Sequence, residues 1–244
     1  MTAFAERLQG IEERIARACL RSGRNRSEIK LMGVSKFHGI DRIEEARQNG
    51  IRLFGESRVQ EAAEKFSAPK EFNSPATGVE LHMIGSLQRN KAKTAISLFD
   101  CIQSVDRESI IAELGKYAAE TALEKKAPLK VLLELHTGEE SKAGFSDEES
   151  LLRAAAQVLE FSGLVPAGLM TMAPYSNDTD LVRSSFRALV RAQKKLEKEF
   201  PGSDWSCLSM GMSNDFEIAI EEGSTLLRIG TALFGDRDYG GMQK

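Results

Sequence analysis

The chain has 244 residues, of which 41% are hydrophobic, and its formal net charge at pH 7 is −3. This length and composition can build one large core, and the slight acidity gives no electrostatic basis for binding nucleic acid or an anionic membrane. Charged residues already stand at Glu6 and Arg7, and no apolar run approaches the roughly 20 residues of a membrane span. We therefore expect neither a signal peptide nor a membrane helix.

Cysteine and histidine are sparse and scattered. Cys19, Cys101 and Cys207 form no CxxC pair and cannot all be joined in disulfides, which is typical of a protein from a reducing compartment. The three histidines show no spacing that would suit a metal ion. These observations indicate a cytoplasmic protein without a metal site.

The predicted elements begin with a helix, in which Leu8, Ile11, Ile15 and Cys19 follow helical spacing. Short apolar runs then alternate with amphipathic stretches, of which 179–200 is a long one, and 67–78 is expected to be a surface loop. The apolar runs cover residues 29–35, 51–57, 79–85, 101–105, 129–137, 165–172, 205–211 and 225–235.

Eight strand–helix units in about 230 residues predict a (β/α)8 TIM barrel with an extra N-terminal helix, built by residues 1–244 as one domain. A doubly wound open sheet is the alternative, because the count of strands could differ from eight. A TIM barrel carries its chemistry at the carboxyl ends of its strands. Polar residues gather at those ends in this chain, among them Lys36, Ser57, His82, Ser209 and Arg228.

Two glycine-containing stretches near the end of the chain suggest a phosphate site. The first runs from Ser209 through Gly211 and Met212 to Ser213, and the second carries Gly230-Thr231. Barrels often bind phosphate with the loops after strands seven and eight, where backbone N–H groups can surround a dianion. Ordinary turn glycines and a helix cap at Ser213 would explain the same letters.

Several segments, spread in order over nearly the whole chain, resemble the pyridoxal phosphate homeostasis protein family, whose members are single-domain relatives of the alanine racemase N-terminal barrel. The resemblance implies a monomeric barrel that binds pyridoxal 5′-phosphate (PLP) through a lysine imine and controls free PLP, with PLP-dependent apo-enzymes as candidate recipients. The segments are GVSK (33–36), FGESRVQE (54–61), HMIGSLQRNK (82–91), GEESKAGF (138–145), GLMTM (168–172), LSMGMSNDFEIAI (208–220) and RIGTALFG (228–235).

The resemblance assigns the imine to Lys36 and the contact with the pyridine nitrogen to Arg228. A lysine amine attacks an aldehyde when it is unprotonated, and a strand end at a barrel mouth offers a partly dry position. An arginine donates a hydrogen bond without giving up its proton, which leaves the ring a weak electron sink. The alternatives are a solvated Lys36, and an Arg228 paired in the core with Glu217 or Glu56.

Two further cofactor contacts are expected, and two positions depart from the family. Ser57 is expected near the ring hydroxyl, and His82 beside the ring, with a structural core histidine as the alternative. Asn is usual in the family where this chain has Ser57, and Thr-Lys often follows the Schiff-base lysine, where this chain has Phe37-His38.

Three functions are compatible with these residues: a PLP homeostasis protein, a PLP-dependent amino-acid racemase of low activity, and a barrel enzyme that acts on a phosphorylated substrate without PLP. A two-base racemase needs an acid/base group on each face of the substrate. Beside Lys36, Tyr175 is the plausible second group. We expect little or no racemase activity and favour the first function.

Overall fold

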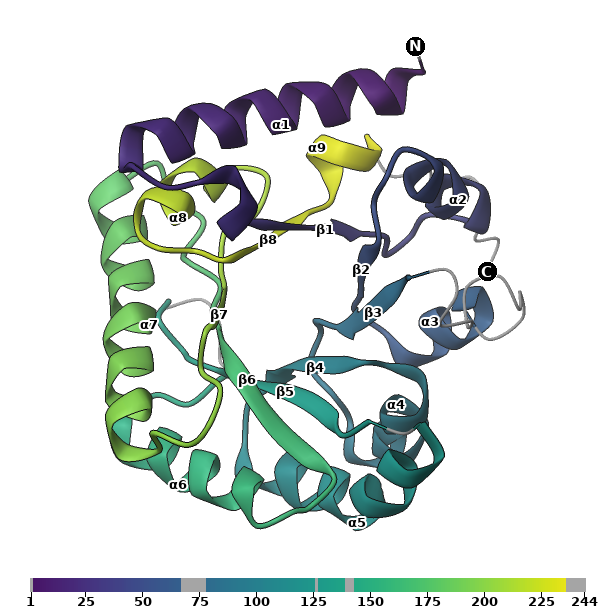
Figure 1. Ribbon diagram of the computed structural model, residues 1–244, viewed down its shortest axis with the longest axis vertical. Coiled ribbons are helices and arrows are strands. Elements are labelled where there is room, and N and C mark those ends of the chain that lie inside the picture. The colour runs from purple at the N-terminus through teal and green to yellow at the C-terminus, as the bar shows by residue number, and fades with distance from the viewer. Residues whose placement is uncertain (1, 67–77, 126, 139–142, 236–244) are drawn as a thin grey trace.

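The computed structural model describes residues 2–66, 78–125, 127–138 and 143–235. Eight strands, all paired in parallel with their neighbours, close into a barrel in the order β1 to β8, and helices surround it (Figure 1). The predicted TIM barrel is therefore confirmed, and the open sheet is wrong. Most of the predicted loop 67–78 lies outside the described residues.

Each predicted apolar run contributes one strand. The strands are β1 (Lys30–Val34), β2 (Leu53–Glu56), β3 (Glu80–Met83), β4 (Cys101–Val105), β5 (Leu129–Glu134), β6 (Leu164–Met170), β7 (Cys207–Ser209) and β8 (Leu226–Ile229). The helices are α1 (Ala3–Ser22), α2 (Ile40–Gln48), α3 (Val59–Phe66), α4 (Ala92–Leu98), α5 (Glu108–Lys125), α6 (Glu148–Leu159), α7 (Thr179–Glu199), α8 (Phe216–Glu221) and α9 (Thr231–Phe234), with 3-10 turns at Arg26–Glu28 and Arg89–Lys91.

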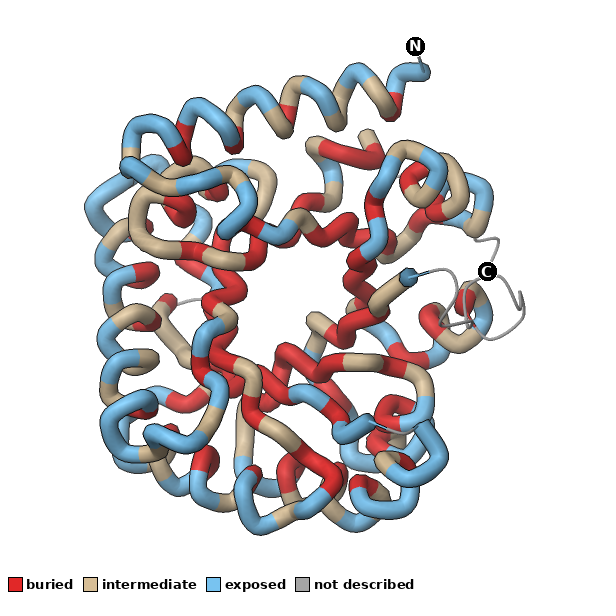
Figure 2. Tube along the Cα trace, in the orientation of Figure 1, coloured by how far each residue is buried: buried red, intermediate tan, exposed pale blue. Residues whose placement is uncertain are grey.

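Side chains that alternate along the strands form two layers of packing. The outward-facing residues pack against the helices in one large apolar core. Inside the barrel, two small apolar clusters lie among polar residues, and Figure 2 shows how fully the strands are buried. The clusters consist of Met32, Leu53 and Leu226, and of Cys101, Leu132 and Met170.

The predicted N-terminal helix is confirmed as α1, which lies across α8 and α9 (Figure 1). Thr2 caps its start by accepting a hydrogen bond from the Ala5 N–H, and Gly23 ends it in the left-handed conformation with φ 68°. Because α9 has only four residues, it leaves the β8 side of the barrel thinly covered. The buried face of α1, with Ile11 and Ile15, completes that cover.

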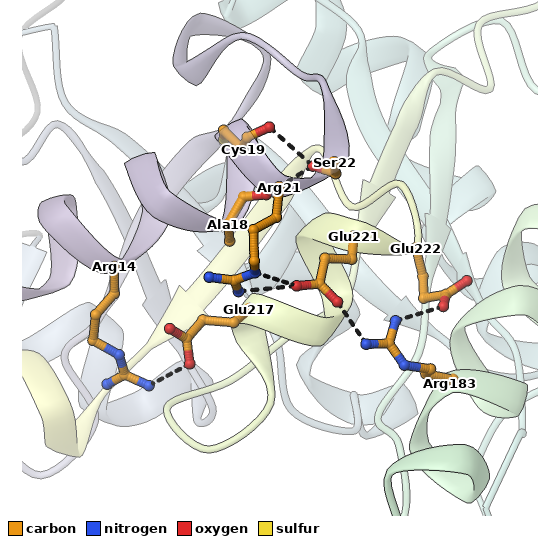
Figure 3. Close-up of polar contacts among 9 residues, drawn as sticks. All are labelled: Arg14, Ala18, Cys19, Arg21, Ser22, Arg183, Glu217, Glu221 and Glu222. Atoms are coloured by element: carbon orange, nitrogen blue, oxygen red, sulfur yellow. Dashed lines mark hydrogen bonds and ion pairs between the residues drawn. The ribbon is translucent and has the colours of Figure 1, made fainter.

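Charged side chains join α8 to the helices on both sides of it (Figure 3). Arginines of α1 and α7 pair with glutamates of α8 and of the residue after it, at N–O distances of 2.5 to 3.0 Å. These pairs are partly exposed, so each contributes at most about 1 kcal/mol, and together they orient α8 more than they stabilise it. The pairs are Arg14–Glu217, Arg21–Glu221, Arg183–Glu221 and Arg183–Glu222.

Shortening a buried side chain of α1 should destabilise the whole barrel. Ile15 is fully buried against the core, so we expect Ile15→Ala to lower the free energy of unfolding by about 2–5 kcal/mol. Leu20 on the same helix is 82% exposed, and Leu20→Ala should change it by less than about 0.5 kcal/mol. Urea titration measures both variants. Equal, small effects would show that α1 is not part of the cooperative unit.

Candidate functional site

The parallel strands bring the predicted lysine and one predicted phosphate loop to the same edge of the barrel. In the pairing of β1 with β8, Met32 lies opposite Arg228 and Gly33 opposite Ile229. One residue further on, Gly230 lies beside Val34, where an added Cβ would stand 3.5 Å from the Val34 Cβ. Lys36 therefore leaves the barrel next to Gly230.

Lys36 sits in a tight turn directly after β1. The turn spans Ser35 to His38 and is closed by the His38 N–H, which donates to the Ser35 carbonyl at 3.1 Å. Phe37 has φ 67°, a left-handed conformation that is unusual for a bulky residue. Such a residue persists where its surroundings over-determine it, and these places are often functional sites.

Helix α3 holds this turn from outside the barrel. The Phe37 N–H donates to Glu61 Oε1 at 2.5 Å, and Lys65 Nζ donates to the Ser35 carbonyl at 2.9 Å. Lys65 also pairs with Glu56 at 3.0 Å, and the Ser35 hydroxyl donates to the same carboxylate. Burial raises the pKa of Glu56 against the opposing effect of Lys65. These contacts fix the backbone on both sides of Lys36.

Helix α9 holds the other side of the turn. The His38 ring stacks on the Phe234 ring, with the centroids 4.9 Å apart and the planes 22° apart. Phe37 and His38, the two residues that depart from the family pattern, thus both have structural partners at this turn.

Arg228 is buried in the barrel and bound by three oxygen atoms. Its Nη1 donates to the carbonyl and the hydroxyl of Ser209, both at 2.7 Å, and its Nη2 donates to the Thr171 carbonyl at 2.9 Å. Among the residues that the structure describes, no hydrogen bond engages Nε. Burial lowers the pKa of Arg228, yet a guanidinium remains charged in proteins. Its Nε–H is therefore a donor that the described residues leave unused.

The proposed core pairing of Arg228 with Glu217 or Glu56 is wrong. Glu217 pairs instead with Arg14 on the outer surface, at 3.0 Å. Glu56 stands at the end of β2 and pairs with Lys65. Both carboxylates lie outside the barrel wall, whereas the Arg228 side chain lies inside the barrel.

A run of polar side chains extends from Ser209 across the barrel interior. The Ser209 hydroxyl donates to Gln103 Oε1 at 2.6 Å, and Gln103 Nε2 lies 2.7 Å from His82 Nδ1. His82 Nε2 lies 3.0 Å from Glu80 Oε1, and this hydrogen bond is the main reason that the pKa of Glu80 falls to about 2. His82 and Ser209 are predicted site residues, and both face the barrel interior, where their side chains have hydrogen-bond partners. Sequence reasoning missed Gln103.

The loop after β7 is shaped by a glycine. Gly211 has φ 97°, and an added Cβ would come 2.6 Å from the Ala219 Cβ, so both the conformation and the space require glycine. The Met212 N–H, a predicted phosphate donor, donates instead to Asp215 Oδ1 at 2.5 Å. Burial raises the pKa of Asp215.

The loops after β7 and β8 meet, as the phosphate prediction requires. The Ser213 hydroxyl accepts a hydrogen bond from the Ala232 N–H at 3.3 Å. Gly230 precedes Thr231, the exposed first residue of α9. Ser213, Gly230 and Thr231 thus lie close together at the barrel mouth.

Two other predicted residues line separate cavities. Ser57 borders a cavity of about 340 Å³ together with Met83 and Lys91. Tyr175 is 84% exposed and borders a cavity of about 430 Å³ with Met212 and Asp215. Neither cavity includes Lys36 among its lining residues.

Glu134 is a buried carboxylic acid that sequence reasoning also missed. It ends β5, two residues after the inward-facing Leu132, and is 4% exposed. Burial raises its pKa to about 7, the negative charge of Asp106 adds to the effect, and the positive charge of Arg228 opposes it. Glu134 can therefore hold or release a proton near neutral pH.

Within the described ranges, no group of three or more histidine, cysteine or acidic residues could hold a metal ion. In the same part of the chain, no helix has the length and apolar character that a bilayer crossing needs.

Comparison with known proteins gives matches over almost the whole chain. Residues 8–238 match the family model described as alanine racemase, N-terminal domain. The pyridoxal phosphate homeostasis protein of Aquifex aeolicus is 39% identical over 234 residues, which cover 96% of this chain and 98% of that protein. The protein of that name from Vibrio cholerae is 37% identical over 240 residues, which cover 98% of each.

A solved structure agrees with these matches. PipY of Synechococcus elongatus PCC7942, determined with PLP bound, is 34% identical and superposes with a TM-score of 0.77 over 95% of this chain and 100% of its own. The barrel, the order of the strands and the full-length matches lead to one conclusion: this chain belongs to the pyridoxal phosphate homeostasis protein family, which shares the alanine racemase N-terminal domain.

Proposed function

We propose that this protein binds PLP at the carboxyl end of the barrel, attached covalently to Lys36, and that it holds and releases PLP to control the free supply. The observation that carries the proposal is that Lys36 lies in a fixed turn directly after β1, while Arg228 lies on β8, the strand paired with β1, with a guanidinium N–H that the described residues leave unused. The PLP-bound structure of the relative PipY supports it.

The residues present fit the chemistry of this cofactor. PLP supplies an aldehyde for a lysine amine, a pyridine nitrogen that accepts a hydrogen bond, and a phosphate dianion. Lys36 would take the aldehyde, and Arg228 Nε–H would donate to the pyridine nitrogen. Because arginine keeps its proton, the nitrogen stays unprotonated and the ring withdraws electrons weakly. This property suits a carrier, or racemase-like chemistry, better than transamination.

Two of the proposed phosphate contacts already have hydrogen-bond partners within the protein, which supports a smaller phosphate site. Ser209 already bonds Arg228 and Gln103, and the Met212 N–H already bonds Asp215. We therefore assign the phosphate to the donors around Ser213, Gly230 and Thr231, with Gly211 shaping the loop. PLP-dependent apo-enzymes are the recipients that this carrier role implies.

Replacing the lysine tests the proposal directly. Lys36→Ala should abolish the visible absorbance of bound PLP and its trapping by borohydride, because the substitution removes the amine to which the proposal attaches PLP. Lys91→Ala, which removes a lysine at the cavity beside Ser57, should leave both unchanged. Mass analysis of the reduced protein locates the label, and a label on any residue other than Lys36 would contradict the assignment.

The phosphate assignment predicts discrimination between PLP and pyridoxal. Pyridoxal lacks the dianion, so it should bind at least about tenfold more weakly. A Ser213→Ala/Thr231→Ala variant should bind PLP more weakly and reduce the difference between the two ligands. Fluorescence or absorbance titration measures both affinities. Equal binding of PLP and pyridoxal by the unmodified protein would remove the phosphate site from the proposal.

The raised pKa of Glu134 predicts a pH dependence of stability. The carboxyl group ionises near pH 4.5 in the unfolded chain and near pH 7 in the folded one, so its contribution to stability is present below pH 4.5 and is lost as the pH rises toward 7. Between pH 4.5 and pH 7, the free energy of unfolding of Glu134→Gln should rise by about 3 kcal/mol relative to that of the unmodified protein. Urea titrations at several pH values measure the difference.

A control separates this effect from general charge removal. Glu197→Gln removes an exposed carboxylate of α7, and its stability profile should run parallel to that of the unmodified protein. If the Glu134→Gln profile is also parallel, Glu134 titrates normally and is not a proton-holding group of the site.

A further inference from the structure

Hydrogen bonds link Arg228 at the barrel mouth to Glu80 near the opposite end. They pass through Ser209, Gln103 and His82, so that β8, β7, β4 and β3 each contribute a link. These hydrogen bonds, from Arg228 through Ser209, Gln103 and His82 to Glu80, form a relay. We propose that Gln103 is a positioning residue for the cofactor, because it completes this relay and so fixes the direction in which Arg228 presents its Nε–H. The inference rests on the proposed PLP site.

The chemistry of the groups gives every link the same direction. Arginine can only donate, so the Ser209 oxygen accepts from Arg228 and its hydroxyl proton goes to Gln103 Oε1. The Gln103 amide then presents its N–H to His82 Nδ1. With Nδ1 as an acceptor, the ring proton of neutral His82 is on Nε2, which donates to the Glu80 carboxylate.

The relay is closed to solvent over most of its length. Gln103 and Ser209 are fully buried, and Arg228 and His82 are 4% and 6% exposed. Water therefore cannot readily replace a lost link, and a broken relay leaves buried polar groups without partners. A fully satisfied network of this kind holds its members in one arrangement.

Both ends of the relay carry charge. Arg228 is the cation, and Glu80 remains ionised at neutral pH because its pKa is about 2. Lys130 Nζ stands 3.6 Å from the Glu80 carboxylate and balances it at that end of the barrel. Hydrogen bonds that run in one direction between opposite charges polarise one another. Gln103 stands in the middle of the relay, where its amide oxygen accepts from Ser209 and its amide N–H donates to His82.

The loss of Gln103 would release two neighbours at once. The Ser209 hydroxyl would be free to rotate, and His82 Nδ1 would lose its donor. The Ser209 and Thr171 carbonyls would still retain Arg228 in the barrel. The expected defect is therefore a misdirected guanidinium, not an unfolded protein.

Gln103→Leu tests the relay, with Gln193→Leu as its matched control. Gln193 lies on α7 and donates to the Trp205 carbonyl in the outer layer, at 2.9 Å. Gln103→Leu should weaken PLP binding about tenfold and shift the absorbance maximum of bound PLP. Gln193→Leu should change neither. Identical affinities and spectra for the two variants would overturn the proposal.

The His82 tautomer provides a readout that needs no cofactor. Nitrogen-15 NMR of the protein without PLP should show an unprotonated Nδ1 and a protonated Nε2 at neutral pH. In Gln103→Glu the carboxylate can still accept from Ser209, but it cannot donate to His82, so Nδ1 should also become protonated while Nε2 keeps the proton that it donates to Glu80. A protonated Nδ1 in the unmodified protein would overturn the relay even if Gln103→Leu does not fold.

The two proposals fail in different ways. If the unmodified protein does not bind PLP, the proposed function is wrong, and Gln103 has no cofactor to position whatever the NMR shows. If it binds PLP and Gln103→Leu behaves like Gln193→Leu, the proposed function stands and the role of Gln103 is wrong.

Discussion

The interior of this barrel is organised around a guanidinium that cannot lose its charge. A buried cation is unfavourable unless hydrogen bonds replace the water it has left. Arg228 obtains them from two carbonyls and one hydroxyl. That hydroxyl needs its own acceptor, which is Gln103, and the Gln103 amide in turn donates to His82. The polar layer in the middle of the barrel follows from the burial of one arginine, with the apolar clusters packed around it.

The lysine of the candidate site is supported in a different way. Its turn is held by α3 and α9, on the outer side of the barrel wall, through Glu61, Lys65 and the stacked His38. Arg228 is held from within, by neighbouring strands. A ligand that contacts both Lys36 and Arg228 therefore links a residue held from outside the barrel wall to one held from within. The contacts named for the two supports have no side chain in common, so a substitution in one set should leave the other in place.

The sequence was sufficient to predict the fold and to nominate part of the candidate site. The rhythm of apolar runs predicted the barrel, and Lys36 and Arg228 were singled out because they stand near strand ends and match segments of the family. Gln103 was missed because the run CIQSV resembles a plain buried strand, and its partner Ser209 is 106 residues away, so that only barrel closure brings the two together. Glu134 was missed for the same reason: its unusual proton affinity comes from burial in the closed barrel and from Asp106.

The packing of α1 on α8 and α9 affects the order in which the protein folds. Helix α1 is synthesised before α8 and α9, which it contacts, and β1 likewise pairs with β8. During synthesis, the apolar face of α1 lacks these two partners until they have been made. Closing the barrel and docking α1 therefore both wait for β8, α8 and α9, and contacts so distant in sequence form slowly. Until then the unfinished chain exposes two unpaired strand edges and one apolar helix face, the surfaces that chaperones protect.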